Sequence, residues 1–208
     1  MLWDVSCIVL AGGKGSRLKR DKILETVGNR SLLERVVSVI NSFSSNIIVV
    51  TAKGQSYPQL TGHPMLRIVT DIYPDKGALG GLYTGLVASK SFYNLVVASD
   101  MPFLNLALLR YMTQLASGFD AVVPRLGNMV EPLHAVYFKN CIPPLERLLK
   151  QGNLKTSNIL PLIRVRYVEA QEIDRFDLKH LSLFNVNTES ELEKARELAR
   201  GNRSDVEC

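Results

Sequence analysis

The chain has 208 residues, of which 46% are hydrophobic and 22% charged, and its net charge is +5. This length suits one α/β domain with a single sizeable core. The sequence holds no run of about 18 apolar residues. Its N-terminal apolar stretch is neither preceded by a basic region nor followed by a small-residue cleavage site. We therefore expect neither a transmembrane helix nor a signal peptide, and no membrane association.

The cysteines and the basic residues narrow the class further. Cys7, Cys141 and Cys208 are far apart and form no CxxC pair, which argues against a disulfide framework or a zinc site. A reducing cytoplasm is the simplest compartment. The basic residues do not form one long block, so we expect no nucleic-acid partner.

The first half of the chain predicts strands that alternate with helices. The apolar run 5–10 predicts a strand that ends at a glycine loop. Apolar residues recur with a helical period over 31–43, and Ser31 with Glu34 has the spacing of a capping box. The next elements predicted are strands at 46–50 and 66–69, a helix at 78–89 and a strand at 94–99.

The second half predicts helices at 106–116, 143–151 and 188–200. Strands are predicted at 120–123, 133–138, 163–168 and 184–186. We expect a single domain over residues 1–200 and a flexible tail over 201–208.

This alternation predicts a Rossmann-like, three-layer α/β/α fold around a mostly parallel sheet. In such sheets, ligands bind at the carboxyl ends of the strands. The glycine loop, Asp71 and Asp100 all directly follow predicted strands, so we expect them along one edge.

The glycine loop has the chemistry of a polyphosphate site. It reads LAGGKGSR over residues 10–17, and Asp21 and Lys22 follow. Glycines let the backbone N–H groups approach phosphate oxygens, and Lys14, Arg17 and Lys22 can neutralise a triphosphate. The spacing excludes a Walker A loop, and Leu18 stands where a dinucleotide fingerprint needs its third glycine. The alternative is a plain strand-to-helix turn that happens to be basic.

Asp100 ends the apolar strand VVAS and precedes Met101-Pro102. One or two carboxylates plus substrate phosphates are the usual protein ligands of Mg²⁺, so Asp100 is a candidate magnesium ligand. A helix N-cap is the alternative role, but Asn105 is better placed to cap the helix predicted at 106–116.

A third element, DIYPDKGALGG over residues 71–81, also follows a strand. Asp71 and the glycines, Gly80 among them, could lie against a base or ribose. A turn before a glycine-rich helix would give the same pattern.

These segments together resemble a known family. LAGGKGSRLKRDK is similar to the LAGG-x-x-x-R-M-G-x-D-K motif of the molybdenum cofactor guanylyltransferases, the MobA-type enzymes of the MobA-like NTP transferase superfamily. DIYPDKGALGG, ASDMPFL, EPLHAVY and FNVNTESEL resemble further motifs of that family, in the same order. The matches span residues 10–192. The resemblance implies a nucleotidyltransferase fold and an enzyme that transfers GMP from GTP to the terminal phosphate of molybdopterin, releasing pyrophosphate.

The resemblance also implies residue roles. Arg17, Lys22 and Asp100 are the expected catalytic residues, and Asp100 is the expected ligand of the cofactor Mg²⁺. Asn185 and Asn187 are expected near the pterin acceptor. The nucleotide is expected to contact Leu10, Ala11, Gly12, Gly13, Lys14, Lys22, Asp71, Gly80 and Asp100. Gly12 favours GTP, since an alanine there tends to accompany CTP use. Other cofactor-biosynthesis proteins or molybdoenzymes are possible partners by resemblance only.

The sequence departs from the family pattern at Leu18-Lys19, at Ala78 and at Glu131, and the last places an anion near the expected acceptor. Other functions therefore stay open: a cytidylyltransferase for the same cofactor, a nucleotidyltransferase for a sugar or another phosphate, or a non-catalytic nucleotide-binding regulator. No histidine–carboxylate pair is recognisable. The expected reaction needs no general base, because the attacking phosphate is already an anion.

Overall fold

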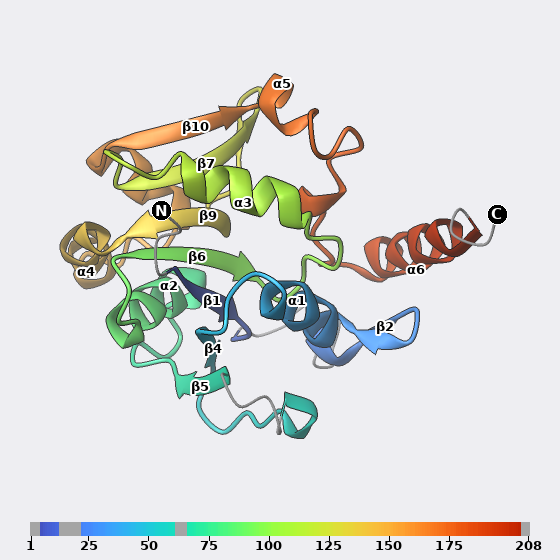
Figure 1. The fold of residues 1–208 in the computed structure, drawn as a ribbon. Helices are drawn as coiled ribbons and strands as arrows, with labels where there is room; N and C mark the ends of the chain where they lie inside the picture. Colours follow the sequence, from blue (N-terminus) through green and yellow to red (C-terminus); the bar gives the residue numbers. More distant parts are fainter. Residues whose placement is uncertain (1–4, 13–21, 61–65, 205–208) are drawn as a thin grey trace.

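The computed structural model describes residues 5–12, 22–60 and 66–204. Its main sheet has the strand order β10-β7-β9-β6-β1-β4-β5, with β8 paired to β7 (Figure 1). The strands of this sheet are β1 (Ser6–Leu10), β4 (Ile47–Thr51), β5 (Leu66–Thr70), β6 (Tyr93–Ala98), β7 (Ala121–Leu126), β8 (Met129–Val130), β9 (His134–Phe138) and β10 (Val165–Glu169).

The sheet is mostly parallel, as the alternation of strands and helices predicts. Strands β5, β4, β1 and β6 pair in parallel, and β10 is parallel to β7. Strand β9 is antiparallel to both of its neighbours, and β8 closes a hairpin with β7. The chain therefore adds β4 and β5 on one side of β1 and then crosses over to place β6 on the other side. Ligands of such sheets bind at this switch of direction, beyond the carboxyl ends of β1 and β6.

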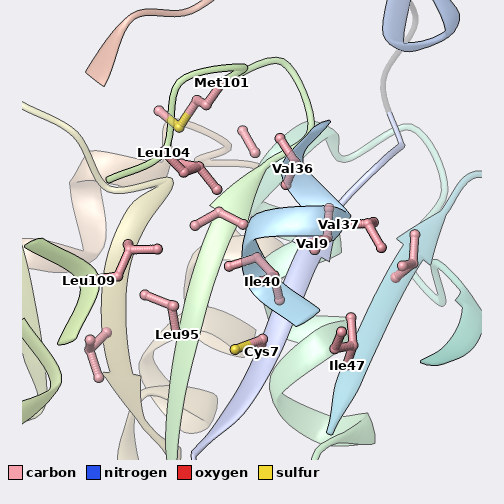
Figure 2. Close-up of a cluster of buried hydrophobic side chains, with 14 of the residues drawn as sticks. Cys7, Val9, Val36, Val37, Ile40, Ile47, Leu95, Met101, Leu104 and Leu109 are labelled. Atoms are coloured by element: carbon pink, nitrogen blue, oxygen red, sulfur yellow. The ribbon is translucent and has the colours of Figure 1, made fainter. Parts of the chain in front are cut away.

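Helices cover both faces and give the predicted three layers. The helices are α1 (Leu32–Asn41), α2 (Gly77–Ala88), α3 (Leu106–Gln114), α4 (Ile142–Lys150), α5 (Ala170–Ile173) and α6 (Glu189–Ser204). The core on one face joins α1 and α3 to the sheet, and Figure 2 shows its centre, where Ile40 of α1 lies over Cys7 and Leu95. The other core joins α2 and α4 to the opposite face through residues such as Ile8, Leu82 and Leu145.

A third, smaller cluster attaches α6 to the rest of the molecule. The hairpin of β2 (Thr26–Val27) and β3 (Arg30–Ser31) packs with α6 and the start of α1. Arg196 of α6 donates to the carbonyl of Thr26 at 3.0 Å and pairs with Glu25 at 3.2 Å. Figure 1 shows α6 projecting beyond the sheet next to this hairpin.

Two predicted helix starts are confirmed in detail. Ser31 caps α1 in a capping box with Glu34, and the side chain of Asn105 accepts from Leu108 N at the start of α3. Because Asn105 fills the cap, Asp100 is left for another role. Two prolines at the start of α4 fit the first helical turn, where a missing N–H costs nothing.

One prediction at the C-terminal end was wrong. Residues 184–186 form no strand. The Val186 N–H donates to the Asp100 carbonyl at 2.9 Å, and this bond is not part of a strand ladder. Helix α6 continues as far as Ser204, and the flexible tail over 201–208 stays a prediction. Residues 205–208 lie outside the described part of the chain.

Cys7 and Cys141 are buried free thiols. Among the described residues, no helix combines the length and apolar character that crossing a bilayer requires.

Candidate active site

The candidate site lies where β1 and β6 end side by side. Beyond the two strands, Ser99 N donates to the carbonyl of Leu10 at 3.1 Å, and Ala11 N donates to Val50 at the end of β4 at 2.8 Å. These bonds extend the sheet pattern by one residue, so Leu10, Ala11 and Asp100 lie along one edge, as predicted. Asp71 N bonds the Thr51 carbonyl at 2.8 Å and brings the end of β5 to the same edge.

Lys22 and Asp100 form the centre of this edge. Lys22 is in a short 3₁₀ turn (Lys22–Leu24), and its Nζ lies 2.7 Å from Oδ2 of Asp100 and 2.8 Å from Oδ1 of Asn187. The side chains of Lys22 and Asp100 are only 20% and 15% exposed. Three residues separated by up to 165 positions in the sequence therefore meet at one ammonium group.

The second carboxylate oxygen of Asp100 fits a cation. Oδ1 is buried and has no hydrogen-bond partner among the described residues. A buried carboxylate oxygen without a partner is costly unless a ligand satisfies it. Within the described ranges, no three His, Cys, Asp or Glu side chains group to hold a metal by themselves. At nucleotide sites Mg²⁺ is commonly held by one or two carboxylates together with substrate phosphate oxygens, and Asp100 offers one such carboxylate.

A segment after the last 3₁₀ turn borders Asp100, whose carbonyl accepts from Val186 N at 2.9 Å. We call residues 184–188 the strap. Its Asn185 Nδ2 donates to Oε2 of Glu131 at 3.1 Å, and Asn187 accepts from Lys22. Val186 points the other way and is fully buried against Val27 and Leu32. The strap thus presents its two predicted acceptor residues on one side, as an extended chain does.

Glu131 and Glu191 hold the strap but were not predicted to. Glu131 precedes β9 and also accepts from Leu133 N at 3.2 Å. Burial raises its pKa, and the nearby Asp100 carboxylate adds to the rise. Glu191 accepts from Asn187 N and Thr188 N, both at 2.8 Å. Thr188 and Glu191 have capping-box spacing, so the sequence carried a signal for this contact.

On the nucleotide side, Asp71 organises the turn that leads into α2. Its Oδ1 accepts from Tyr73 N at 2.9 Å and from the Thr84 hydroxyl at 2.7 Å. A Cβ on Gly80 would lie 2.8 Å from the Tyr73 carbonyl oxygen. The glycine at this position therefore has a packing reason of its own, whether or not a nucleotide lies against it.

Gly12 follows Ala11 at the end of β1 and passes close to β4. A Cβ there would lie 3.1 Å from the backbone nitrogen of Ala52. The buried Tyr57 hydroxyl donates to the Ala11 carbonyl at 3.1 Å, a contact that no sequence pattern indicates. The predicted site residues Gly13, Lys14 and Arg17 lie outside the described residues, as do Leu18 and Lys19.

The side chains of His134 and His180, the two histidines among the described residues, make no hydrogen bond to Lys22, Asp100 or Asn187. His180 does pair with a carboxylate, since its Nε2 lies 2.6 Å from Oδ1 of Asp174. The absence of any such pair, inferred from the sequence, was thus wrong. His134 is fully buried in β9, and neither ring nitrogen has a hydrogen-bond partner among the described residues. Burial lowers its pKa to about 4. His63 lies outside the described residues.

Comparison with known proteins gives one consistent family. Residues 7–163 match the MobA-like NTP transferase domain. The chain is 35% identical over 197 residues to a probable molybdenum cofactor guanylyltransferase of Pelotomaculum thermopropionicum, covering 95% of this chain and 94% of the relative. A second protein of the same description, from Methanosarcina mazei, is also 35% identical and covers 90% of this chain and 88% of its own length.

The crystal structure of molybdopterin-guanine dinucleotide biosynthesis protein A from Archaeoglobus fulgidus is similar throughout. It matches with a TM-score of 0.83 and 26% identity, covering 95% of this chain and all of that one.

Proposed function

The chain belongs to the MobA-like NTP transferase family, and from this premise we propose that it transfers GMP from GTP to the terminal phosphate of molybdopterin-type molybdenum cofactor. Pyrophosphate is the second product. The observation that carries the proposal is the meeting of Lys22, Asp100 and Asn187 at the edge beyond β1 and β6. This arrangement joins the expected nucleotide side to the expected acceptor side at one charged centre.

The reaction is a phosphoryl-type substitution at the α-phosphorus of GTP. An oxygen of the acceptor phosphate forms a bond to this phosphorus, and the bond from the α-phosphorus to the bridging oxygen of pyrophosphate breaks. No proton has to be removed from the attacking group, because a phosphate monoester is already anionic at neutral pH. Catalysis therefore rests on alignment of the two phosphates and on neutralisation of their charge.

The residues of the site divide this work. We propose that Leu10, Ala11 and Gly12 bind the nucleotide along the end of β1, with Asp71 and Gly80 organising the far side. Lys22 is close enough to Asp100 for its ammonium group to neutralise part of the charge of a phosphate bound beside that carboxylate. Gly13, Lys14 and Arg17 remain proposed phosphate ligands from the sequence.

Asp100 is the proposed ligand of Mg²⁺. Its buried Oδ1 is open to a cation, while Oδ2 is held by Lys22. A bound Mg²⁺ would supply charge neutralisation of the phosphates. The backbone of Asp100 is held by the strap, because its carbonyl accepts from Val186 N at 2.9 Å.

Asn185 and Asn187 are the proposed acceptor residues. Both are carboxamides on the same side of the strap. Asn185 bonds Glu131, and Asn187 bonds Lys22, which in turn pairs with the Asp100 carboxylate. A product of this kind is handed on, so cofactor-biosynthesis proteins or molybdoenzymes are the partners we expect. The buried free thiols of Cys7 and Cys141 are compatible with the reducing cytoplasm that we propose as its compartment.

The proposal is tested with purified protein, molybdopterin as acceptor and GTP labelled at the α-phosphate. We expect Mg²⁺-dependent formation of a labelled dinucleotide and release of one pyrophosphate for each product. Calorimetry with GTP, CTP, ATP and UTP should show preference for GTP. Binding of CTP instead would move the function to the cytidylyltransferase, and nucleotide binding without turnover of any acceptor would favour the regulator.

Two variants test the roles of the central pair. Asp100→Asn keeps the shape of the side chain and an oxygen for Lys22 but removes the charge, and Lys22→Met removes the ammonium group. Each should lower kcat by about 10²-fold or more, the scale of a single lost charge stabiliser. Glu172→Gln on α5 is a matched control, because this carboxylate bonds Tyr111 and Arg166 away from the site. Normal turnover in Asp100→Asn would refute the metal assignment.

A further inference from the structure

The strap is fastened at four points, and each fastening comes from a different part of the chain. Asn185 bonds Glu131 before β9, and Val186 N bonds the Asp100 carbonyl after β6. Asn187 bonds Lys22, and its own N–H bonds Glu191 at the start of α6. Two of the four fastenings therefore act directly on the residues of the proposed reaction centre.

Glu131 is itself held by hydrogen bonds to both its backbone and its side chain. Glu131 N donates to the Pro124 carbonyl at 3.1 Å, and the Glu131 carbonyl accepts from His134 N at 3.2 Å. Its carboxylate uses one oxygen for Leu133 N and the other for Asn185. The Leu133 carbonyl in turn accepts from Ala98 N at the end of β6, at 2.9 Å. The side chain is thus built into the sheet edge that carries Asp100.

This geometry gives Glu131 a specific task. Both carboxylate oxygens already accept a hydrogen bond from the protein, so the side chain is set to orient a neighbour. That neighbour is the Asn185 carboxamide, whose Nδ2 is directed at Glu131 and also lies 3.3 Å from the Leu183 carbonyl. An amide whose N–H₂ is held in this way has its oxygen in a defined direction.

We propose that Glu131 is a positioning residue for the acceptor: it holds Asn185, and through it the strap, in the register that sets Asn187 against Lys22. The inference rests on the proposed function, since it assigns the strap to the acceptor. It also explains how a carboxylate is accommodated at a position where the resembling family has a neutral or basic residue. The charge is directed into the protein and satisfied there, so it does not confront the acceptor phosphate.

A double-mutant cycle tests this role. Glu131→Ala should raise the acceptor KM by about 10-fold, the size of one lost hydrogen bond to a charged group, and change the GTP Kd by less than about 2-fold. Glu131→Gln should recover part of the loss, because its amide oxygen can still accept from one of the two donors. In an Asn185→Ala background, Glu131→Ala should have almost no further effect, since the residue through which it acts is gone. An undiminished 10-fold effect in that background would overturn the proposal.

Amide hydrogen exchange at Val186 gives a readout that needs no acceptor. This N–H belongs to the strap and bonds the Asp100 carbonyl outside it. Glu131→Ala should therefore accelerate its exchange by about 10-fold or more, and Asn185→Ala should do the same. Unchanged exchange in Glu131→Ala would overturn the proposal even if turnover fell. If the wild-type protein failed to modify molybdopterin, the proposed function would fail, while the exchange measurement would still decide whether Glu131 positions the strap.

Glu172→Gln controls for loss of stability in general. Glu172 is also a half-buried carboxylate that accepts from several donors, but it lies on α5. It should leave the acceptor KM and the Val186 exchange unchanged. Equal changes in Glu172→Gln and Glu131→Ala would mean that the effects come from destabilisation, and would also overturn the proposal.

Discussion

Helix α2 packs on the sheet through two glycines one turn apart, and the structure predicts opposite effects for the same substitution at each. A Cβ on Gly81 would lie 3.4 Å from Cδ2 of Leu10, which is an ordinary contact. A Cβ on Gly85 would lie 2.4 Å from Cγ2 of Ile8 and 3.3 Å from Val50. Ile8 is in the central strand and fully buried, so it has no free space into which to move.

The magnitudes follow from two competing terms. Alanine in place of glycine within a helix gains about 0.5–1 kcal/mol at either position. At Gly81 nothing opposes this gain, so Gly81→Ala should raise the free energy of unfolding by about that amount. At Gly85 the overpacking costs about 1–3 kcal/mol, so Gly85→Ala should be destabilised by about 1 kcal/mol net. The two variants should therefore differ by about 2 kcal/mol.

Calorimetric melting measures this difference directly. For a chain of this length, 1 kcal/mol corresponds to about 2–4 °C in Tm, so the two melting temperatures should be separated by about 4–8 °C. Since α2 carries Gly80 and packs on the strand that ends at Leu10, Gly85→Ala should also weaken binding of GTP with Mg²⁺. Equal melting temperatures, or a Gly85→Ala variant as stable as the wild type, would refute the packing argument.

Two further predictions concern buried polar groups. Because burial lowers the pKa of His134 from 6.5 to about 4, the unfolded chain binds a proton below pH 6.5 that the folded protein does not, and stability should fall as the pH drops. Between pH 7.5 and 4.5 this should lower the free energy of unfolding by about 2–3 kcal/mol, a loss that His134→Leu should lack. Urea midpoints that fall equally in the two proteins between these pH values would contradict it. Tyr57→Phe removes the hydroxyl that bonds the Ala11 carbonyl and should cost about 1 kcal/mol in urea unfolding, with weaker GTP binding; a variant unchanged in both would remove Tyr57 from the support of the site.

The layered sheet, and the edge on which the site lies, could be predicted from the residues alone. Apolar runs such as IIVV are buried on both faces of the sheet, so the absence of alternation identified them as central strands. The capping residues Ser31 and Asn105 act within three or four positions of themselves, and local signals of that kind can be read without a structure. The glycine loop and Asp100 were assigned to one edge because parallel strands bring their carboxyl ends together.

The assembly of this edge, in contrast, depends on contacts between residues that are far apart in the sequence. The antiparallel strand β9 gives no signal in its own residues that distinguishes it from a parallel strand, yet it brings Glu131 beside Asp100. The strap was mistaken for a strand because its pattern of a buried Val186 between two outward asparagines is the period of any extended chain. Whether that chain pairs with a neighbouring strand depends on what lies beside it. Here the neighbours are the side chains of Lys22 and Glu131 and the single backbone carbonyl of Asp100, all from distant parts of the sequence.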